Sequence, residues 1–476
     1  MSSVGYNEIG SDGTYRHVLR IALPLIVSTS SSTVMQFVDR VFLGWHSTTS
    51  LGAAMGGSFP VWTLTSLFIG TASYTSTFVA QYYGAGRRSG VSNSVWQGLL
   101  FASFSWIILI VAGAFASEII SVMKHSPEVM AQEIVYFRIL VLGAGLQVLS
   151  AVLSSFYSGI GRTRTIMVVE TLGNVVNFFL AYALILGKWG MPRLGIRGAG
   201  IATVSAWAFV AITYACMARF GPLGRSYGIL RDPRVDTALL WRIVRYGVPS
   251  GLQWTADVAG WTIFVALVGR LGAIQLEAVS ATFTINALAF QPMIGLGIAT
   301  SIIVGQSVTA GRIPAAERAT RRAFTLTFAY MATLSALYVA LPRTLIRLFS
   351  PETNDAQFAT VVAYSVVLLR FVALYNLFDG MNIVYAGAIR GAGDTRFVLL
   401  MVVGLSTSLL IVPTYLAIQV FRLGVYAAMA AATAYVVVIA LCFYARYKGG
   451  KWKSMRVIEA PAVVPGPAAG GPVSGS

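Results

Sequence analysis

The chain has 476 residues, of which 56% are hydrophobic and only 11% are charged. Soluble domains carry about 25% charged residues, so the composition excludes an ordinary soluble globular protein and extensive disorder. The net charge is +17. It does not indicate nucleic-acid binding, because the basic residues lie in connections between apolar runs. The mean hydropathy of +0.73 instead predicts an integral membrane protein.

The apolar runs predict twelve membrane-spanning helices, since each can supply the roughly 20 residues that a spanning helix needs. The first six are expected at 18–44, 52–83, 93–116, 131–159, 165–187 and 197–218. The second six are expected at 238–268, 276–309, 316–347, 357–387, 395–419 and 424–446. The predicted fold class is therefore all-α integral membrane.

The longest polar connection falls at the midpoint and divides the chain into two halves. We expect an N-terminal segment at 1–15, an N-lobe at 16–220, an interlobe loop at 221–236 and a C-lobe at 237–448. The tail at 449–476 ends in a stretch rich in Pro, Gly, Ala and Ser, which predicts disorder.

Basic residues in the connections predict the orientation. Twenty-three Arg and Lys residues fall on one side of the predicted bundle and eight on the other. The positive-inside rule then places both termini and the interlobe loop in the cytoplasm, with the chain in the inner membrane.

The two halves resemble each other at an offset of 225 residues. Pro24 falls on Pro249, Gln81 on Gln306, and residues 85–87 on 310–312, both Ala-Gly-Arg. Six helices separate the copies, so the repeats are parallel. Parallel repeats predict two pseudo-symmetric six-helix lobes with a substrate cavity between them.

Four carboxylates lie inside apolar helices, where an ionised group is costly unless it faces an interior cavity. They are Asp39, Glu170, Asp257 and Asp379. Such a group can exchange a proton, coordinate Na⁺ or pair with an organic cation. The alternative is a structural ion pair or hydrogen bond.

Spacing adds polar partners to these carboxylates. Tyr375 lies one turn before Asp379, while Glu170, Asn174 and Asn177 share a helix face. Polar atoms on one stripe of a spanning helix should face the bundle interior. Interhelical bonding without a transport role remains the alternative for the asparagines.

Aromatic side chains in the middle of predicted helices are candidates for binding a flat cation by stacking and cation–π contact. We expect Trp254, Trp261, Phe283 and Asn286 to join Asp39 and Asn174 at the substrate site. Lipid-facing packing is the alternative for each ring.

The motifs of other energy sources and chemistries are missing from the sequence. It contains no Walker-type loop, no His/Cys metal spacing and no recognisable hydrolase motif. We therefore expect no enzyme activity, no catalytic residue and no cofactor.

Several segments resemble the MATE (multidrug and toxic compound extrusion) transporters of the MOP superfamily. They are LPLIVSTSSSTVMQFVDRVFLG at 23–44, LGIRGAGIAT at 194–203, GVPSGLQWTADVAGWTIFVALVGRLGA at 247–273, PMIGLGIATSIIVGQSVTAGR at 292–312 and FDGMNIVYAGAIRGAGDTR at 378–396. The resemblance covers about residues 16–446 and implies a V-shaped pair of six-helix lobes.

The resemblance also implies roles for individual residues. Asp39 matches the family's first-helix Asp, and Asn177 and Thr203 resemble its N-lobe companions. Where the family usually has Asp or Asn, this chain has Ala181, so the resemblance does not supply a complete N-lobe Na⁺ cage.

In the C-lobe, Asp257 matches a seventh-helix acidic position that is Glu in the NorM-like branch, and Asp379 and Tyr375 match that branch's tenth-helix pair. Asp257 and Asp379 are thus the expected Na⁺ ligands if Na⁺ is the coupling ion. We expect coupling carboxylates in both lobes.

The resulting prediction is a secondary antiporter, acting as a monomer in the lipid bilayer. It would export small organic cations or amphipathic compounds in exchange for H⁺ or Na⁺ by alternating access. The rival within the superfamily is a lipid-linked oligosaccharide flippase, which needs a strongly cationic cavity. A rival of another class, an integral membrane enzyme acting on lipid, needs a nucleophile–base pair or metal ligands at one interface.

Overall fold

The computed structural model describes residues 13–231, 233–347 and 356–459, which form helices and connections without a β-strand. Eleven of the described helices are long and apolar enough to cross a membrane. The one predicted span not among these eleven, at 52–83, corresponds to α2 and α3, which follow each other with a break at Tyr74. The predicted all-α fold with twelve spans is confirmed.

The N-lobe and the central connection contain α1 (Tyr15–His46), α2 (Thr48–Ser73), α3 (Thr75–Gly84), α4 (Arg88–Ala114), α5 (Ala116–Ser121), α6 (Pro127–Gly159), α7 (Thr163–Leu186), α8 (Ile196–Phe220) and α9 (Pro222–Tyr227). The short helix α9 lies within the predicted interlobe loop. The C-lobe contains α10 (Thr237–Gly269), α11 (Ala273–Thr309), α12 (Ile313–Ala340), α13 (Pro342–Arg347), α14 (Ala356–Ala392), α15 (Thr395–Leu405), η2 (Ser406–Ile411), α16 (Val412–Tyr415), η3 (Leu416–Val420) and α17 (Val425–Lys448).

The segment from α15 to η3 forms one span with two π-helical stretches around Pro413. Proline has no N–H to donate to the preceding turn, and a wider π turn is one way for a helix to absorb that loss.

Large apolar side chains point outward along the spans. Phe37 is 66% exposed and Leu400 65%, a level expected where lipid rather than water covers the surface.

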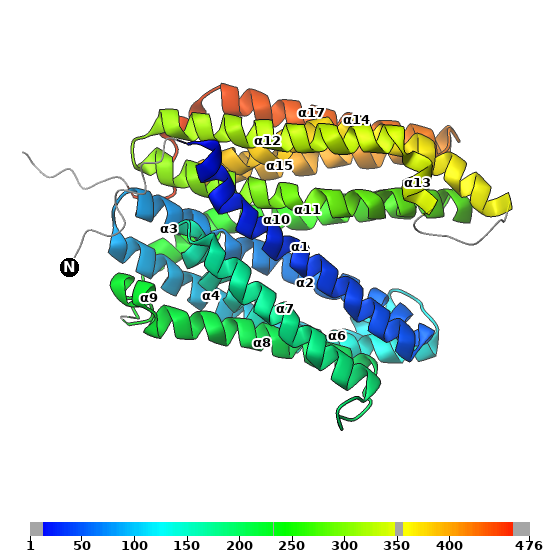
Figure 1. Cartoon of the computed structure of the whole chain (residues 1–476), viewed down its shortest axis with the longest axis horizontal. Helices are drawn as coiled ribbons and strands as arrows, with labels where there is room; N and C mark the ends of the chain where they lie inside the picture. Colours follow the sequence, from blue (N-terminus) through cyan, green and yellow to red (C-terminus); the bar gives the residue numbers. More distant parts are fainter. Residues whose placement is uncertain (1–12, 232, 348–355, 460–476) are drawn as a thin grey trace, which may run out of the picture.

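The two lobes lie side by side and diverge toward the end remote from the termini (Figure 1). The contact between them is reciprocal, because α2 packs on α10 while α11 packs on α1. At the first of these contacts the backbones nearly touch. A Cβ on Gly70 would lie 2.7 Å from the Gly251 Cα. We call the end that carries the described termini the closed end.

The predicted repeat is visible in the backbone of matching turns. Gly86 and Gly311 both have a left-handed conformation, with φ of 74° and 72°. The N–H of the following arginine returns to a helix carbonyl in each copy, from Arg87 to Tyr82 and from Arg312 to Ser307. Glycine adopts this conformation without strain, which explains why the Ala-Gly-Arg turn occurs twice.

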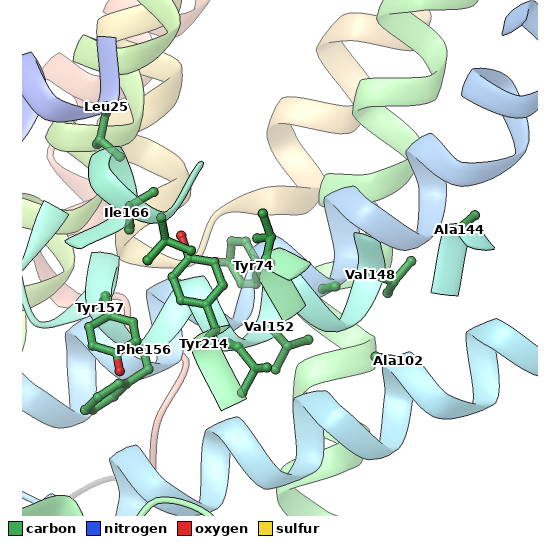
Figure 2. Packing of buried hydrophobic residues seen from close by; sticks show 14 of the residues in the cluster. Leu25, Tyr74, Ala102, Ala144, Val148, Val152, Phe156, Tyr157, Ile166 and Tyr214 are labelled. Carbon is green, nitrogen blue, oxygen red and sulfur yellow. The ribbon is translucent and has the colours of Figure 1, made fainter. Parts of the chain in front are cut away.

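In the N-lobe core, side chains of α6 pack with neighbours that include Ile166 of α7 and Tyr214 of α8 (Figure 2). Tyr157 and Tyr214 stack there at 5.8 Å between ring centroids. The same cluster continues into the C-lobe through Leu296 and Ile303 of α11, whereas a second core fills the C-lobe itself. The continuous core joins the lobes at the closed end.

The prediction of disorder from residue 449 onward is wrong for residues 449–459. A 3-10 turn, η4 (Lys451–Ser454), buries Trp452, and Val457 is 2% exposed. We call residues 449–459 the C-terminal strap. The composition of the strap does not predict this packing, because only three of its apolar side chains are buried: Trp452, Val457 and Ile458. The expectations for residues 1–12 and 460–476 lie outside the described residues.

Candidate functional site

Two of the candidate carboxylates lie near each other inside the C-lobe. Asp257 lies in α10 and Asp379 in α14, close enough for their charges to interact. The Tyr435 ring of α17 interacts electrostatically with both. Asp379 is buried, whereas Asp257 is half-buried. Two like charges within electrostatic range of each other favour the binding of a proton or cation.

Amide side chains hold each carboxylate in place. Gln253, one turn before Asp257 on α10, donates from Nε2 to Asp257 Oδ2 at 2.8 Å. Asn382, three residues after Asp379, donates from Nδ2 to Asp379 Oδ1 at 3.1 Å. These bonds fix the directions of the carboxylates and leave one oxygen of each for a ligand.

A second polar group lies beside the carboxylates, between α11 and α14. Asn286 Nδ2 donates to the Tyr375 hydroxyl at 3.3 Å, and Asn376 Nδ2 donates to Asn286 Oδ1 at 3.0 Å. Asn376 Oδ1 is buried, and the described residues offer it no hydrogen-bond partner. Tyr375 and Asn286 therefore lie together, and Asn376 is an addition that the sequence analysis missed.

Two of the predicted rings, Trp261 and Phe283, lie beside this polar group. Trp261 contacts Phe283 edge-on at 5.5 Å and lies 6.5 Å from the Tyr375 ring, both measured between centroids. The two predicted rings pack against the C-lobe core. Trp254 is half-buried on α10, and no ring contact joins it to this cluster among the described residues. The rings can offer stacking surface to an organic cation.

In the N-lobe, Asp39 lies half-buried on α1, and its Oδ1 is buried without a hydrogen-bond partner among the described residues. Tyr136 of α6 lies within electrostatic range of Asp39. The neighbouring Arg40 is exposed. An unsatisfied buried oxygen is costly, so this carboxylate is suited to a proton or cation.

The other predicted N-lobe residues form separate pairs. Asn177 Nδ2 donates to Thr203 Oγ1 at 3.4 Å, and Asn177 Oδ1, like Asp39 Oδ1, is buried and unsatisfied within the described part of the chain. Ala181, one turn later, is fully buried and adds no oxygen.

Glu170 and Asn174 make their bonds to other helices. Tyr214 of α8 donates to Glu170 Oε1 at 3.2 Å, and Asn174 Nδ2 donates to Ser31 Oγ of α1 at 2.9 Å. Both contacts fit interhelical bonding, the alternative left open for this face. No bond joins either residue to Asp39 in the described residues.

A cluster of three or more His, Cys, Asp or Glu side chains that could hold a metal ion does not occur in the described residues. Na⁺ at Asp257 and Asp379 would thus need amide, hydroxyl or water oxygens to complete its shell, as hard cations accept.

Two charged residues near the ends of the spans have partners that the sequence analysis did not identify. Arg390 lies in the last turn of α14, where its Nη1 donates to Gln253 Oε1 at 3.3 Å. Glu133, close to the start of α6, is fully buried and lies 2.8 Å from His125 Nδ1. Both partners lie outside the local sequence pattern, so only the packed structure shows them.

Comparison with known proteins gives consistent matches over most of the chain. A family model described as MatE matches residues 24–183 and 249–416. The multidrug resistance protein PmpM of Pseudomonas aeruginosa is 29% identical over 393 residues, which are 81% of this chain and 80% of that protein. The multidrug resistance protein MdtK of Edwardsiella ictaluri is 28% identical over 408 residues, 84% of this chain and 88% of that protein.

Solved structures agree on the fold. A MOP superfamily transporter from Pyrococcus furiosus superposes with a TM-score of 0.85 at 19% identity, covering 96% of this chain and all of that one. A multidrug resistance MATE family transporter described in an outward-facing conformation gives a TM-score of 0.80 at the same identity, with the same coverage of both chains.

Proposed function

Because the chain belongs to the MatE family and is a multi-pass membrane transporter, we propose that it is a secondary antiporter. It exports small organic cations or amphipathic compounds in exchange for H⁺ or Na⁺. The observation that carries this proposal is the pair of interacting carboxylates, Asp257 and Asp379, beside the Trp261, Phe283 and Tyr375 rings. The curated relatives, named as multidrug resistance proteins, support the substrate class.

The coupling follows from competition for negative charge. An organic cation and a coupling cation both gain from the carboxylates, and the site cannot neutralise both fully. Arrival of H⁺ or Na⁺ at Asp257 and Asp379 weakens the hold on substrate, and Asp39 supplies a second such position in the N-lobe. A ligand drives the change between states only if it binds them differently.

The orientation of this cycle rests on charge. The closed end carries the connections rich in Arg and Lys, so the positive-inside rule places this end on the cytoplasmic side of a bacterial inner membrane. The lobes diverge at the opposite end (Figure 1). We therefore interpret the structure as the outward-open state of a transporter that acts as a monomer.

The test is efflux of a fluorescent organic cation from proteoliposomes under an imposed pH gradient or an imposed Na⁺ gradient. We expect D257N and D379N each to lower the rate at least about tenfold, which corresponds to about 1.4 kcal/mol. We expect D39N to lower it as well. The matched control is E118Q, which removes an exposed carboxylate.

Efflux with ΔpH alone would identify the carboxylates as proton carriers. A requirement for Na⁺ would assign a sodium site around Asp257, Tyr375 and Asp379. If all three Asp→Asn variants keep the wild-type rate, the carboxylate mechanism is wrong. If the wild-type protein transports under neither gradient, the antiport proposal fails and a flippase assay with a lipid-linked oligosaccharide takes its place.

A further inference from the structure

A short relay of hydrogen bonds connects Asp257 to Arg390. Gln253 donates from Nε2 to Asp257 Oδ2 at 2.8 Å and accepts from Arg390 Nη1 at its Oε1, at 3.3 Å. The amide can satisfy an anion on one side and a cation on the other only in this orientation. Gln253 is 8% exposed, so the relay is shielded from competing solvent.

The backbone around Arg390 carries the contact between the lobes. The Arg390 carbonyl accepts from the Tyr74 hydroxyl at 2.9 Å. The carbonyls of Gly391 and Ala392 accept from Gln81 Nε2 at 3.0 and 3.3 Å. Tyr74 and Gln81 belong to the N-lobe, whereas α14 belongs to the C-lobe. The last carbonyls of a helix have no partner within it, so the opposite lobe supplies the cap of α14.

The Arg390 guanidinium needs a negative partner at this position. Asp257 interacts electrostatically with Arg390. Other groups around this relay are the phenols of Tyr74 and Tyr435 and the carboxylates of Asp379 and Asp394. Asp394 is already paired with Arg446 at 2.8 Å. Neutralising Asp257 therefore removes the counter-charge that the relay delivers, and an uncompensated charge away from water is costly.

We infer that Arg390 is a positioning residue that couples cation occupancy of Asp257 to the contact between the lobes at the closed end. This inference rests on the proposed antiport. With Asp257 ionised, Arg390 stays on Gln253 and the end of α14 remains under Tyr74 and Gln81. With Asp257 neutralised, Arg390 leaves, the last turn of α14 shifts, and the closed end opens. Arrival of the external cation thus favours the inward-facing state.

The experiment measures the distance between the lobes directly. Spin labels are placed at S226C, on α9 of the N-lobe side, and at K448C, at the end of α17, both exposed. The two native cysteines, Cys216 and Cys442, are replaced by serine. The full-length protein in nanodiscs is titrated with protons and, separately, with Na⁺. We expect the wild-type distance distribution to shift to longer values as the coupling cation is added.

The variants separate the coupling role from a merely structural one. D257N should show the longer distance without added cation. In R390Q, the fraction of molecules that shifts to the longer distance when the cation is added should fall about fivefold or more, although Asp257 is intact. R390K keeps the charge and should restore part of the response. R396Q, four residues after the end of α14 and exposed, is the matched control and should respond as the wild type.

If R390Q responds to the cation as the wild type does, the inference is overturned. It is also overturned if the distance between the labels in the wild-type protein changes with neither cation. The parallel efflux assay keeps the two hypotheses apart. Efflux in the wild type combined with a normal cation response in R390Q refutes only the role of Arg390. Absence of wild-type efflux under both gradients refutes the proposed antiport, whatever the labels show. If R390Q does not fold, Q253L tests the same relay, and its wild-type response would equally overturn the inference.

Discussion

Glu133 is a carboxylate that is buried beside one polar partner, His125. Its side chain is fully buried, with Oε1 2.8 Å from His125 Nδ1 and Oε2 lacking a hydrogen-bond partner among the described residues. It lies against the backbone of Gly56, where an added Cβ would collide with Oε1. Glycine at position 56 thus leaves room for the carboxylate, which a larger side chain there would displace.

We predict that H125A destabilises the protein by about 1–3 kcal/mol, because it leaves the Glu133 carboxylate buried without a partner. The measurement is the midpoint of thermal unfolding in detergent, followed by tryptophan fluorescence, where we expect a fall of several degrees. H125A/E133Q should recover part of the loss, since the neutral amide costs less to bury. An unchanged midpoint in H125A would show that the pair contributes nothing.

The sequence identifies single residues whose burial has a high free-energy cost, but it does not identify the residues that they contact. Asp257, Asp379 and Asp39 were predicted because a carboxylate in an apolar helix is expensive wherever it points. Arg390 and Gln253 were missed because an arginine at a helix end and a glutamine within a span are both ordinary. Their role depends on a bond between α10 and α14, which no pattern within either helix encodes.

Among the elements, the spanning helices were predictable and the C-terminal strap was not. Lipid requires long apolar runs, so the predicted ranges fall on the observed helices from α1 to α17. The strap is held by few contacts. The Trp452 ring stacks on Tyr447 at 5.0 Å, and the Val457 N–H donates to Gln81 Oε1 at 2.8 Å.

The strap ends in a carboxylate, Glu459, that forms ion pairs with both lobes. Glu459 pairs with Arg87, beside α4, and with Arg242 of α10, and it accepts a bond from the Tyr82 hydroxyl at 2.7 Å. Partial burial opposes ionisation of Glu459. The hydrogen bonds from Tyr82, from its own backbone and from Arg242 outweigh that effect and lower its pKa.

A lowered carboxylate pKa makes docking of the strap depend on pH. The contribution of Glu459 is complete above the ordinary value of about 4.3 and is lost as pH falls through the lowered pKa. We predict that a spin label at S454C is immobile at pH 7 and becomes mobile only below about pH 4. E459Q should make the label more mobile at pH 7 and remove its response in that range. Because Glu459 is half-exposed, the change at pH 7 should be modest. Equal mobility in both proteins would exclude the ion pair as the anchor.

For the whole molecule, the pseudo-twofold repeat matters most where the lobes cap each other. Gln81 of α3 donates to the Gly391 carbonyl at the end of α14, and Gln306 of α11 donates at 2.6 Å to the Gly159 carbonyl at the end of α6. The two glutamines occupy equivalent positions in the repeat. Each lobe thus supplies the donor that the other lobe's helix end requires.

Because the lobes cap each other, we predict that both glutamines act on the same equilibrium, the one between the closed and the open arrangement of the closed end. Their effects should differ in size. Q306L should leave the Gly159 carbonyl without its donor and weaken the closed end by about 1–3 kcal/mol, which is roughly 5- to 150-fold in the ratio of the two states. Q81L should have the larger effect, because Gln81 also bonds Ala392 and Val457.

The distance between labels at S226C and K448C measures this ratio, and Q419L, an exposed glutamine in η3, is the matched control. If the lobes separate as rigid bodies about the pseudo-twofold axis, both caps break in the same transition. The free-energy effects of the two single substitutions should then add in the double variant. A double variant that falls clearly short of the sum would mean that losing one cap already loosens the other within the closed state, and the lobes would then not separate as rigid bodies.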